Sequence, residues 1–353
     1  MKNNMEFDVD VLAEKTIEML AVAPGQTIWI WANVVSMDFI EALAYHIRAR
    51  GAFWTLRLSS LPLLSRIGHD APQEYLGLVP LHELRWLDDI DAIIELRDHG
   101  GHIPDVPIDR RRAMGTEWLA LIEEAARKGI RRVMVINPTP ALADAVHLPV
   151  DELQRRIMQA IDVDYSVVDS RQEWAAGLLD KADSVHVTCP AGTDLRLRVD
   201  GRKALTDTDS IPHGEAYIAP LEDSAEGMAV IEKAFFRGRM VEKLQLTFSG
   251  GRVVNVEASD SAGAESFREM LAVSSGDKDR IAEFAIATNP GVTEPIGYVS
   301  LDEKIGGSVH IAVGMNDRFG GTNKSNLHQD FVILKPTVWF DNTVILENGI
   351  FKL

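Results

Sequence analysis

The first half of the chain alternates short apolar runs with amphipathic segments, and this alternation most constrains the fold. Four apolar runs have the length and composition of buried strands: 25–33, 52–58, 90–98 and 130–138. Segments with helical spacing lie between them, most clearly at 36–51 and 116–129. Because parallel strands need crossover connections, strands that alternate with helices indicate a parallel sheet covered by helices. The sequence therefore predicts a Rossmann-like α/β domain, which we place at residues 1–184.

The pattern changes near residue 183, where strands separated by turns replace the alternation. "SVHVTCPAGTDLRLRV" (184–199) and "KLQLTFSGGRVVNVEAS" (243–259) each have the pattern of a β-hairpin. Further strands are expected near 282–288, 308–314 and 329–335, with a helix at 263–275 and a closing hairpin after residue 335. We therefore predict a second, β-rich α+β domain at residues 185–353.

Composition limits the classes of function. The chain has 353 residues, a formal net charge of −17 and a pI of about 5.0, which argues against nucleic acid as a partner because phosphate binding needs a basic surface. No apolar run reaches the roughly 18 residues of a membrane span, so no membrane association is expected. The N-terminal segment lacks a signal peptide's apolar stretch, and Cys189 is the single cysteine. These features favour a cytoplasmic protein.

Five residues that can bind metal ions lie in strand-like stretches of the second half: Glu215, Glu283, His310, His328 and Asp330. His328 and Asp330 are two positions apart and therefore share a strand face. Small residues share the faces of His310 and Glu283, which leaves space beside their side chains. Singly, each position has an ordinary explanation as a bonded histidine or a solvated glutamate. Together they suit zinc, cobalt or manganese, in enough number for two ions.

These motifs resemble those of the aminopeptidase T family of metallo-aminopeptidases, which includes aminopeptidase S. The resemblance covers most of the second domain and, more loosely, the first. It implies a two-metal site with these ligands: Glu215 in "GEAYIAP", Glu283 in "AEFAIA", His310 in "SVHIAVG", and His328 and Asp330 in "HQDF". We therefore expect a metallohydrolase that activates water on divalent ions, with Glu215 or Glu283 also moving protons. The resemblance also implies a homodimer.

The sequence departs from this family pattern at one position. The peptidases place a tyrosine seven residues after the equivalent of His310, where this chain has Asp317. An aspartate can act as a ligand or a proton carrier, but it cannot donate a phenolic hydrogen bond. We also expect a shorter chain than that of the classical peptidases. Short peptides with a free amino terminus and small amide or heteroaromatic compounds therefore stay open as substrates.

The chain also resembles, more distantly, the 2,5-dihydroxypyridine dioxygenases, in length and in "EDSAEG" (222–227). These enzymes bind one Fe(II) through two histidines and an aspartate, and His328 and Asp330 match two of those ligands. The third is a histidine where this chain has Glu283, and the dioxygenases lack equivalents of Glu215 and His310. A mononuclear non-haem Fe(II) ring-cleaving dioxygenase is therefore the alternative to the hydrolase. A metal-binding protein without activity is a third possibility.

Two loops carry further polar residues. His99 and His102 follow a predicted strand of the first domain, where ligands approach open α/β sheets, and His102 is a candidate proton carrier. In "DRFGGTNKSN" (317–326), Gly320 and Gly321 would allow a substrate to approach the backbone, and Lys324 with Ser325 could bind a substrate carboxylate. The alternative is a plain hairpin connection.

Overall fold

The computed structural model describes residues 7–100, 106–236 and 239–352. The chain divides into two compact units, one of Met1–Met158 with Asp209–Ile211 and one of Gln159–Thr208 with Pro212–Leu353. Helix α8 (Tyr165–Leu179) belongs to the second unit because its Ala175 and Leu179 are buried in that unit's core. The sequence analysis predicted a boundary between two independently folding domains at residues 184/185. That boundary stays a prediction.

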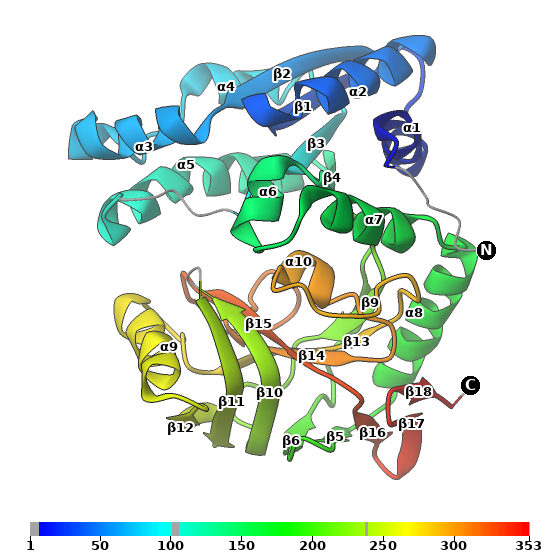
Figure 1. Ribbon diagram of the computed structural model, residues 1–353, viewed down its shortest axis with the longest axis vertical. Coiled ribbons are helices and arrows are strands. Elements are labelled where there is room, and N and C mark those ends of the chain that lie inside the picture. Colours follow the sequence, from blue (N-terminus) through cyan, green and yellow to red (C-terminus); the bar gives the residue numbers. More distant parts are fainter. Residues whose placement is uncertain (1–6, 101–105, 237–238, 353) are drawn as a thin grey trace. The chain divides into compact units, whose positions relative to one another are not determined.

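The first unit is built on a five-stranded sheet in which every paired neighbour is parallel, as the alternating pattern predicted (Figure 1). Its strands, in spatial order, are β2 (Phe53–Ser59), β1 (Thr27–Asn33), β3 (Ala92–Arg97), β4 (Arg131–Ile136) and β8 (Ser210–Ile211). The two-residue strand β8 comes from a segment far along the chain and was not predicted.

The helical spacing at 36–51 and 116–129 agrees with α2 (Met37–Ala49) and α5 (Ile108–Arg127). The other helices of this part of the chain are α1 (Val9–Met19), α3 (Leu61–Asp70), α4 (Leu81–Trp86), α6 (Pro140–Ala145) and α7 (Val150–Ile161). Helix α5 begins after Pro107 rather than near residue 116. A proline is tolerated beside the first turn because its missing N–H would have no partner inside the helix.

A buried aspartate joins the carboxyl ends of β1 and β3, at the point where the strand order reverses. Asp98 is 1% exposed, and its Oδ2 accepts hydrogen bonds from the backbone N–H of Asn33, at 2.9 Å, and from Ser36 Oγ, at 2.6 Å. Thr139 Oγ1 donates to the backbone carbonyl of Asp98, at 2.6 Å, which connects the end of β4 to the same point. The carboxylate of Asp98 therefore connects the ends of β1 and β3, and its backbone carbonyl connects the segment after β4.

We expect Asp98→Ala to lower the free energy of unfolding by about 2–4 kcal/mol, because two buried donors would lose a charged acceptor. Urea unfolding followed by circular dichroism measures the change. Asp89→Ala, at an exposed turn position, is the matched control and should lie within about 0.5 kcal/mol of the parent. Equal effects for the two variants would contradict a structural role for the Asp98 network.

The second unit contains two antiparallel sheets (Figure 1). The eight-stranded sheet has the order β12 (Arg252–Glu257), β11 (Arg239–Ser249), β10 (Glu226–Phe236), β6 (Asp194–Arg198), β5 (Ser184–Thr188), β16 (Thr337–Phe340), β17 (Thr343–Glu347) and β18 (Ile350–Phe351). The five-stranded sheet, called sheet C below, has the order β15 (His328–Ile333), β14 (Val309–Gly314), β13 (Ile281–Ala287), β9 (Glu215–Ile218) and β7 (Leu205–Thr206). The unit also contains α9 (Ser261–Val273) and α10 (Val299–Asp302).

One face of sheet C forms the core of the second unit together with the eight-stranded sheet. The residues of sheet C in this core alternate along each strand: Ala216 and Ile218, Phe284 and Ile286, Val309, Ile311 and Val313, and Phe331 and Ile333. Because strand side chains alternate between faces, the residues between them lie on the opposite face. The five candidate ligands are all on that opposite face.

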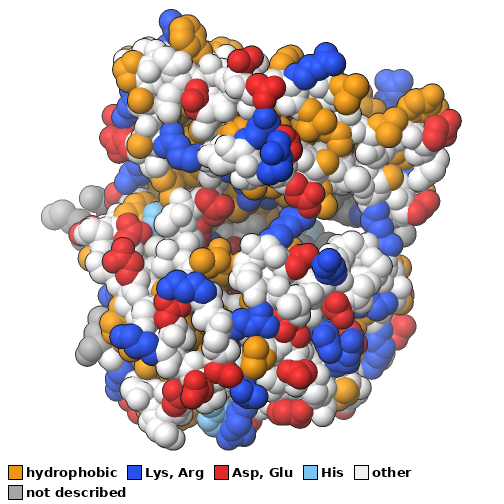
Figure 2. Space-filling model, turned by 180° about the vertical axis from the view of Figure 1, so that it is seen from behind, with side chains coloured by type: hydrophobic (Ala, Val, Ile, Leu, Met, Phe, Trp, Pro, Cys, Tyr) orange, Lys and Arg blue, Asp and Glu red, His pale blue; other side chains and the backbone are white. Residues whose placement is uncertain are grey.

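Among the described residues, no helix combines the length and apolar composition that crossing a membrane requires. On the face drawn in Figure 2, acidic and basic side chains lie interspersed among apolar ones. The net charge of −17 is therefore not gathered there in a single tract.

Candidate metal centre

The pairing of sheet C brings the five candidate ligands together and places a small residue opposite each of them. Strands β9, β13, β14 and β15 are consecutive neighbours in the sheet. The register sets Glu215 against Ala287, Glu283 and Asp330 against Ala312, His310 against Ala285, and His328 against Gly314. These small partners are the residues that the sequence analysis placed on the strand faces of His310 and Glu283, and they leave space for the ligand side chains.

Gly314 is needed at its position for two reasons. Its φ is +113°, a conformation that side-chain-bearing residues rarely adopt, and an added Cβ would lie 2.1 Å from the carbonyl oxygen of Leu327.

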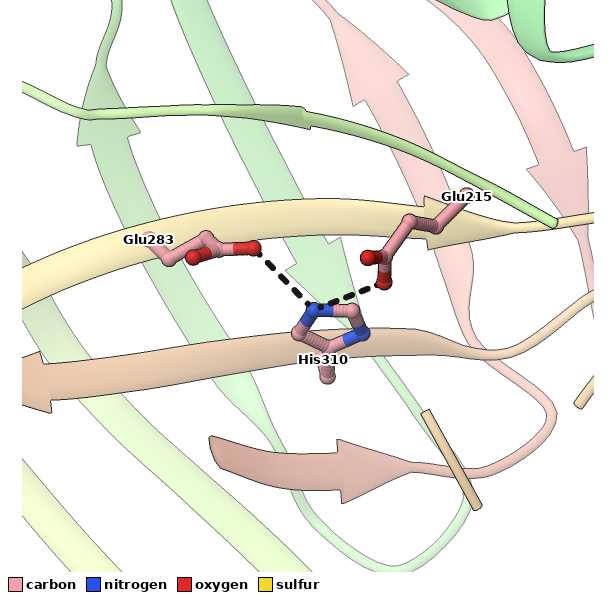
Figure 3. Close-up of side chains that lie close together, drawn as sticks. All are labelled: Glu215, Glu283 and His310. Atoms are coloured by element: carbon pink, nitrogen blue, oxygen red, sulfur yellow. Dashed lines mark hydrogen bonds and ion pairs between the residues drawn. The ribbon is translucent and has the colours of Figure 1, made fainter. Parts of the chain in front are cut away.

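Glu215, Glu283 and His310 form the first of two potential metal-binding groups (Figure 3). His310 Nε2 lies 3.3 Å from Glu283 Oε1 and 3.4 Å from Glu215 Oε2. All three residues are buried, and the ring of His310 is 1% exposed. Figure 3 shows the imidazole of β14 between carboxylates that come from β9 and β13.

Glu283, His328 and Asp330 form the second group. His328 Nε2 lies 3.3 Å from Glu283 Oε2 and 3.2 Å from Asp330 Oδ1. Glu283 therefore belongs to both groups and directs one carboxylate oxygen toward each. A carboxylate in this position has the geometry needed to bridge two cations.

The donor atoms fit divalent ions. Within each group the ligand atoms lie within 4.8 Å of one another. Glu215 Oε2 is buried and accepts no hydrogen bond from the described residues, which is costly for a carboxylate unless a cation is its partner. His328 Nδ1 lies 2.7 Å from the backbone carbonyl of Met315, a contact that orients the ring and leaves Nε2 for a metal.

The buried carboxylates and imidazoles of this site shift one another's pKa values. Burial alone would lower the pKa of His310, but its hydrogen bond to Glu283 and the nearby carboxylates raise it to about 9. The pKa of His328 is likewise raised well above its usual value, against burial, by Asp330 and Glu283. Burial alone would raise the pKa of Glu283, but both imidazoles lower it to about 2. Metal binding must therefore displace protons from both histidines.

Two neighbouring residues of the site were missed by the sequence analysis. Lys304 Nζ lies 2.7 Å from Glu215 Oε1 and 3.2 Å from Glu303 Oε1. Burial raises the pKa of Glu215 to about 8, although the ammonium group of Lys304 opposes this shift. In the sequence, the only sign of these residues was the charged pair Glu303 and Lys304 in "DEKIGG" (302–307), seven and six residues before His310. A short loop without periodicity gave no reason to place that pair beside the ligands.

Asp317 and His99 are members of neither group of ligand atoms. Asp317 is exposed. His99 belongs to the first unit, where burial lowers its pKa. His102 falls in 101–105, outside the described residues. The proposed catalytic roles of Asp317 and His102 stay predictions.

Glu222 and the 316–326 loop form a connected structure. Glu222 accepts hydrogen bonds from Arg202 Nη2, at 2.5 Å, and from the backbone N–H of Thr322, at 2.6 Å. Ser325 Oγ donates to the backbone carbonyl of Ser275, at 2.8 Å. These contacts hold the loop, and the ring of Phe319 lies edge-on to that of His328 with the centroids 5.7 Å apart.

The raised pKa of His310 predicts how the metal-free protein responds to pH. The unfolded chain releases this proton near pH 6.5, whereas the folded chain holds it to about pH 9. The folded state therefore binds more protons in this interval, and its stability falls as the pH rises through it. We expect a decrease on the order of 3 kcal/mol between pH 6.5 and 9 in the free energy of unfolding.

Urea unfolding at pH 6, 7.5 and 9 in the presence of a chelator measures this dependence. His310→Gln should give a flatter profile over the same interval, since the titrating group is removed. A stability that stays level or rises from pH 6.5 to 9 in the parent protein would contradict the proposed proton occupancy.

Comparisons with known proteins agree with this arrangement. The model of a family described as thermophilic metalloprotease (M29) matches residues 8–344. No curated protein sequence gives a significant match. The match confirms the expected family resemblance and the expected enzyme class, a metallohydrolase that requires divalent metal.

Two solved structures share the fold. Wild-type AmpT from Thermus thermophilus superposes with a TM-score of 0.80 at 21% identity, over 98% of this chain and 99% of that chain. A 2,5-dihydroxypyridine dioxygenase from Pseudomonas putida KT2440 superposes with a TM-score of 0.67 at 15% identity, over 97% and 96%. The expectation of a shorter chain than that of the classical peptidases stays a prediction.

Proposed function

The chain belongs to the thermophilic metalloprotease family (M29), and on that premise we propose that it is a dinuclear aminopeptidase acting on short peptides or related amides. One observation carries the proposal: Glu283 lies between two three-residue ligand groups and presents one carboxylate oxygen to each. A bridging carboxylate of this kind suits two divalent ions. Zinc, cobalt and manganese all fit the mixture of imidazole and carboxylate donors.

Divalent ions in such a site polarise the scissile carbonyl and lower the pKa of a bound water. The protein's own residues set the geometry. Lys304 holds Glu215 through Oε1 and leaves Oε2 directed toward His310. The backbone carbonyl of Met315 fixes the ring of His328. Glu283 and Glu215 are the carboxylates placed to take up or return a proton during the reaction.

The alternative function, an Fe(II) ring-cleaving dioxygenase, rests on a likeness of fold and on two matching ligands, His328 and Asp330. The third residue of that group is Glu283, a carboxylate, so the group has one imidazole rather than the two of a facial triad. The ligand chemistry therefore favours the hydrolase. The experiment described next distinguishes the dioxygenase from the hydrolase.

Metal content per chain distinguishes these functions. We expect about two divalent ions in the parent protein after loading with zinc, cobalt or manganese, because two groups are present. Glu215→Ala should retain about one ion, since it removes a ligand from one group only. Glu283→Ala should retain fewer than one, because both groups lose a ligand. Equilibrium dialysis with elemental analysis measures these numbers.

Glu226→Ala, on β10, is the matched control and should bind as many ions as the parent. The loaded parent should hydrolyse leucine p-nitroanilide, and both ligand variants should lose at least about 100-fold in kcat/KM. A single iron that is retained in Glu215→Ala, with oxygen uptake on a dihydroxypyridine, would establish the dioxygenase instead. If the protein binds metal but turns over neither substrate class, it is a metal-binding protein without enzymatic activity.

Four further expectations belong with this proposal. Zinc is our first choice among the divalent ions. A homodimer is expected from the family resemblance, and a cytoplasmic location from the composition and the single cysteine. Asp317 remains the candidate for a sixth ligand or a proton carrier.

A further inference from the structure

One aromatic ring of the 316–326 loop contacts two residues on the ligand-bearing face of sheet C. The ring of Phe319 is edge-on to that of Tyr217, with the centroids 5.7 Å apart, and edge-on to that of His328, also at 5.7 Å. Tyr217 belongs to β9 and His328 to β15, and strands β13 and β14 lie between them. The ring of Phe319 therefore lies between side chains from two strands that are not neighbours.

Tyr217 is on the same face of sheet C as the candidate ligands. Its two neighbours along β9 are part of the apolar core, so its side chain lies on the opposite face, two positions from Glu215. The register sets Tyr217 against Ala285, whose other partner is His310. We call Tyr217 and Phe319 the aromatic pair.

The loop that carries Phe319 is attached to β13 by two asparagines that are 0% exposed. Asn316 Nδ2 donates to the backbone carbonyl of Ala282, at 3.2 Å, and Asn323 Nδ2 donates to that of Ile281, at 2.9 Å. The backbone N–H of Phe319 in turn donates to the carbonyl of Asn316, at 3.2 Å. These bonds hold the ring of Phe319 in place in the free protein, so its ordering costs a bound molecule little entropy.

A glycine at position 321 is part of this arrangement. An added Cβ at Gly321 would lie 2.0 Å from Asn316 Cγ. The space beside Gly321 is thus filled by the asparagine that holds the loop, rather than left to a substrate. The part of the loop that contacts a candidate metal ligand is the ring of Phe319.

The aromatic pair offers apolar surface beside the candidate metal ions. Tyr217 and Phe319 are both half-buried, so each is partly accessible. In an amide whose carbonyl oxygen approaches the ions, the first side chain is attached to the carbon atom bonded to that carbonyl. Because Phe319 touches the ring of His328, this side chain lies close to the aromatic pair. An apolar side chain placed there removes apolar surface from water.

We propose that the ring of Phe319, supported by Tyr217, binds the side chain of the substrate's first residue and makes the enzyme select large apolar residues such as leucine at that position. This inference rests on the proposed hydrolase function and names the class of its substrate. It makes Phe319 a specificity-determining residue, while the five ligand residues keep their separate role of holding the metal ions.

The test compares Phe319→Ala with the parent on leucine p-nitroanilide and on glycine p-nitroanilide, which has no side chain to bind. Loss of an apolar contact of this size corresponds to roughly 10- to 100-fold, so we expect kcat/KM for the leucine substrate to fall by about that factor. The value for the glycine substrate should be unchanged. Phe319→Leu, which keeps an apolar side chain, should recover part of the loss.

Two readouts do not depend on turnover. Metal content should stay at the parent value in Phe319→Ala, because the ring supplies no ligand atom. Calorimetry with leucinol, which cannot be hydrolysed, should show binding weakened by roughly the same factor, whereas 2-aminoethanol should bind both proteins equally. Phe53→Ala, an exposed position on β2 of the first unit, is the matched control and should behave as the parent in every assay.

Three results would overturn the inference. Unchanged kcat/KM for the leucine substrate and unchanged affinity for leucinol in Phe319→Ala would remove the ring from substrate binding. An equal loss on the leucine and glycine substrates, or a loss of metal, would mean that Phe319 positions His328 instead.

Failure of the proposed function gives a different pattern. The metal-loaded parent would then hydrolyse neither substrate. Weaker binding of leucinol, but not of 2-aminoethanol, to Phe319→Ala would still establish the aromatic pair as a site for an apolar side chain, and equal binding of leucinol to both proteins would exclude it.

Discussion

The stability of the second unit depends on the carboxylates that lie close together on one face of sheet C. Glu215, Glu283 and Asp330 extend from that face within a few ångströms of two imidazoles, while alternate residues of the same strands form an apolar core. Like carboxylates repel each other, and burial removes the water that would screen them. The fold must therefore supply positive charge at this place. Protonated histidines, Lys304 and divalent ions are the available sources.

The three sources have different consequences for the protein. Lys304 is covalently part of the chain and contacts Glu215 through one oxygen only, so it orients that carboxylate without occupying the position between the ligand groups. The protons on His310 and His328 occupy the nitrogens that a metal would use, so they compete with it directly. Metal affinity and folding stability are consequently linked through the same atoms.

The predictions from sequence were correct where the periodicity of apolar residues or the spacing of residues along a strand determines the structure. The alternation of strands and helices predicted the parallel sheet, the two-residue strand period put His328 and Asp330 on a shared face, and the family resemblance gave the set of five candidate ligands. The small residues beside His310 and Glu283 were visible in the sequence because they share a strand face. What the sequence could not provide was the strand register, which sets an alanine or glycine opposite each ligand.

Features without periodicity were missed for a physical reason. Glu303 and Lys304 follow the four-residue helix α10, which is too short to show a helical pattern, and their proximity to Glu215 is a contact across 89 positions. Strand β8 has two residues and pairs with β4 from far along the chain. Such contacts depend on the closed tertiary structure, and no local propensity encodes them.

The fold is similar both to that of a peptidase and to that of a dioxygenase, so the fold alone does not determine the reaction. Both structures superpose over nearly the whole chain, at identities too low to carry chemistry from one protein to another. The distinction lies in single positions of sheet C. Glu283 presents one carboxylate oxygen to each ligand group, whereas a neutral imidazole at that position would offer an ion a single donor nitrogen. The ligand set expected of the dioxygenases lacks Glu215, Glu283 and His310, and these three residues suit the site to polarising a carbonyl rather than to binding oxygen at a single iron.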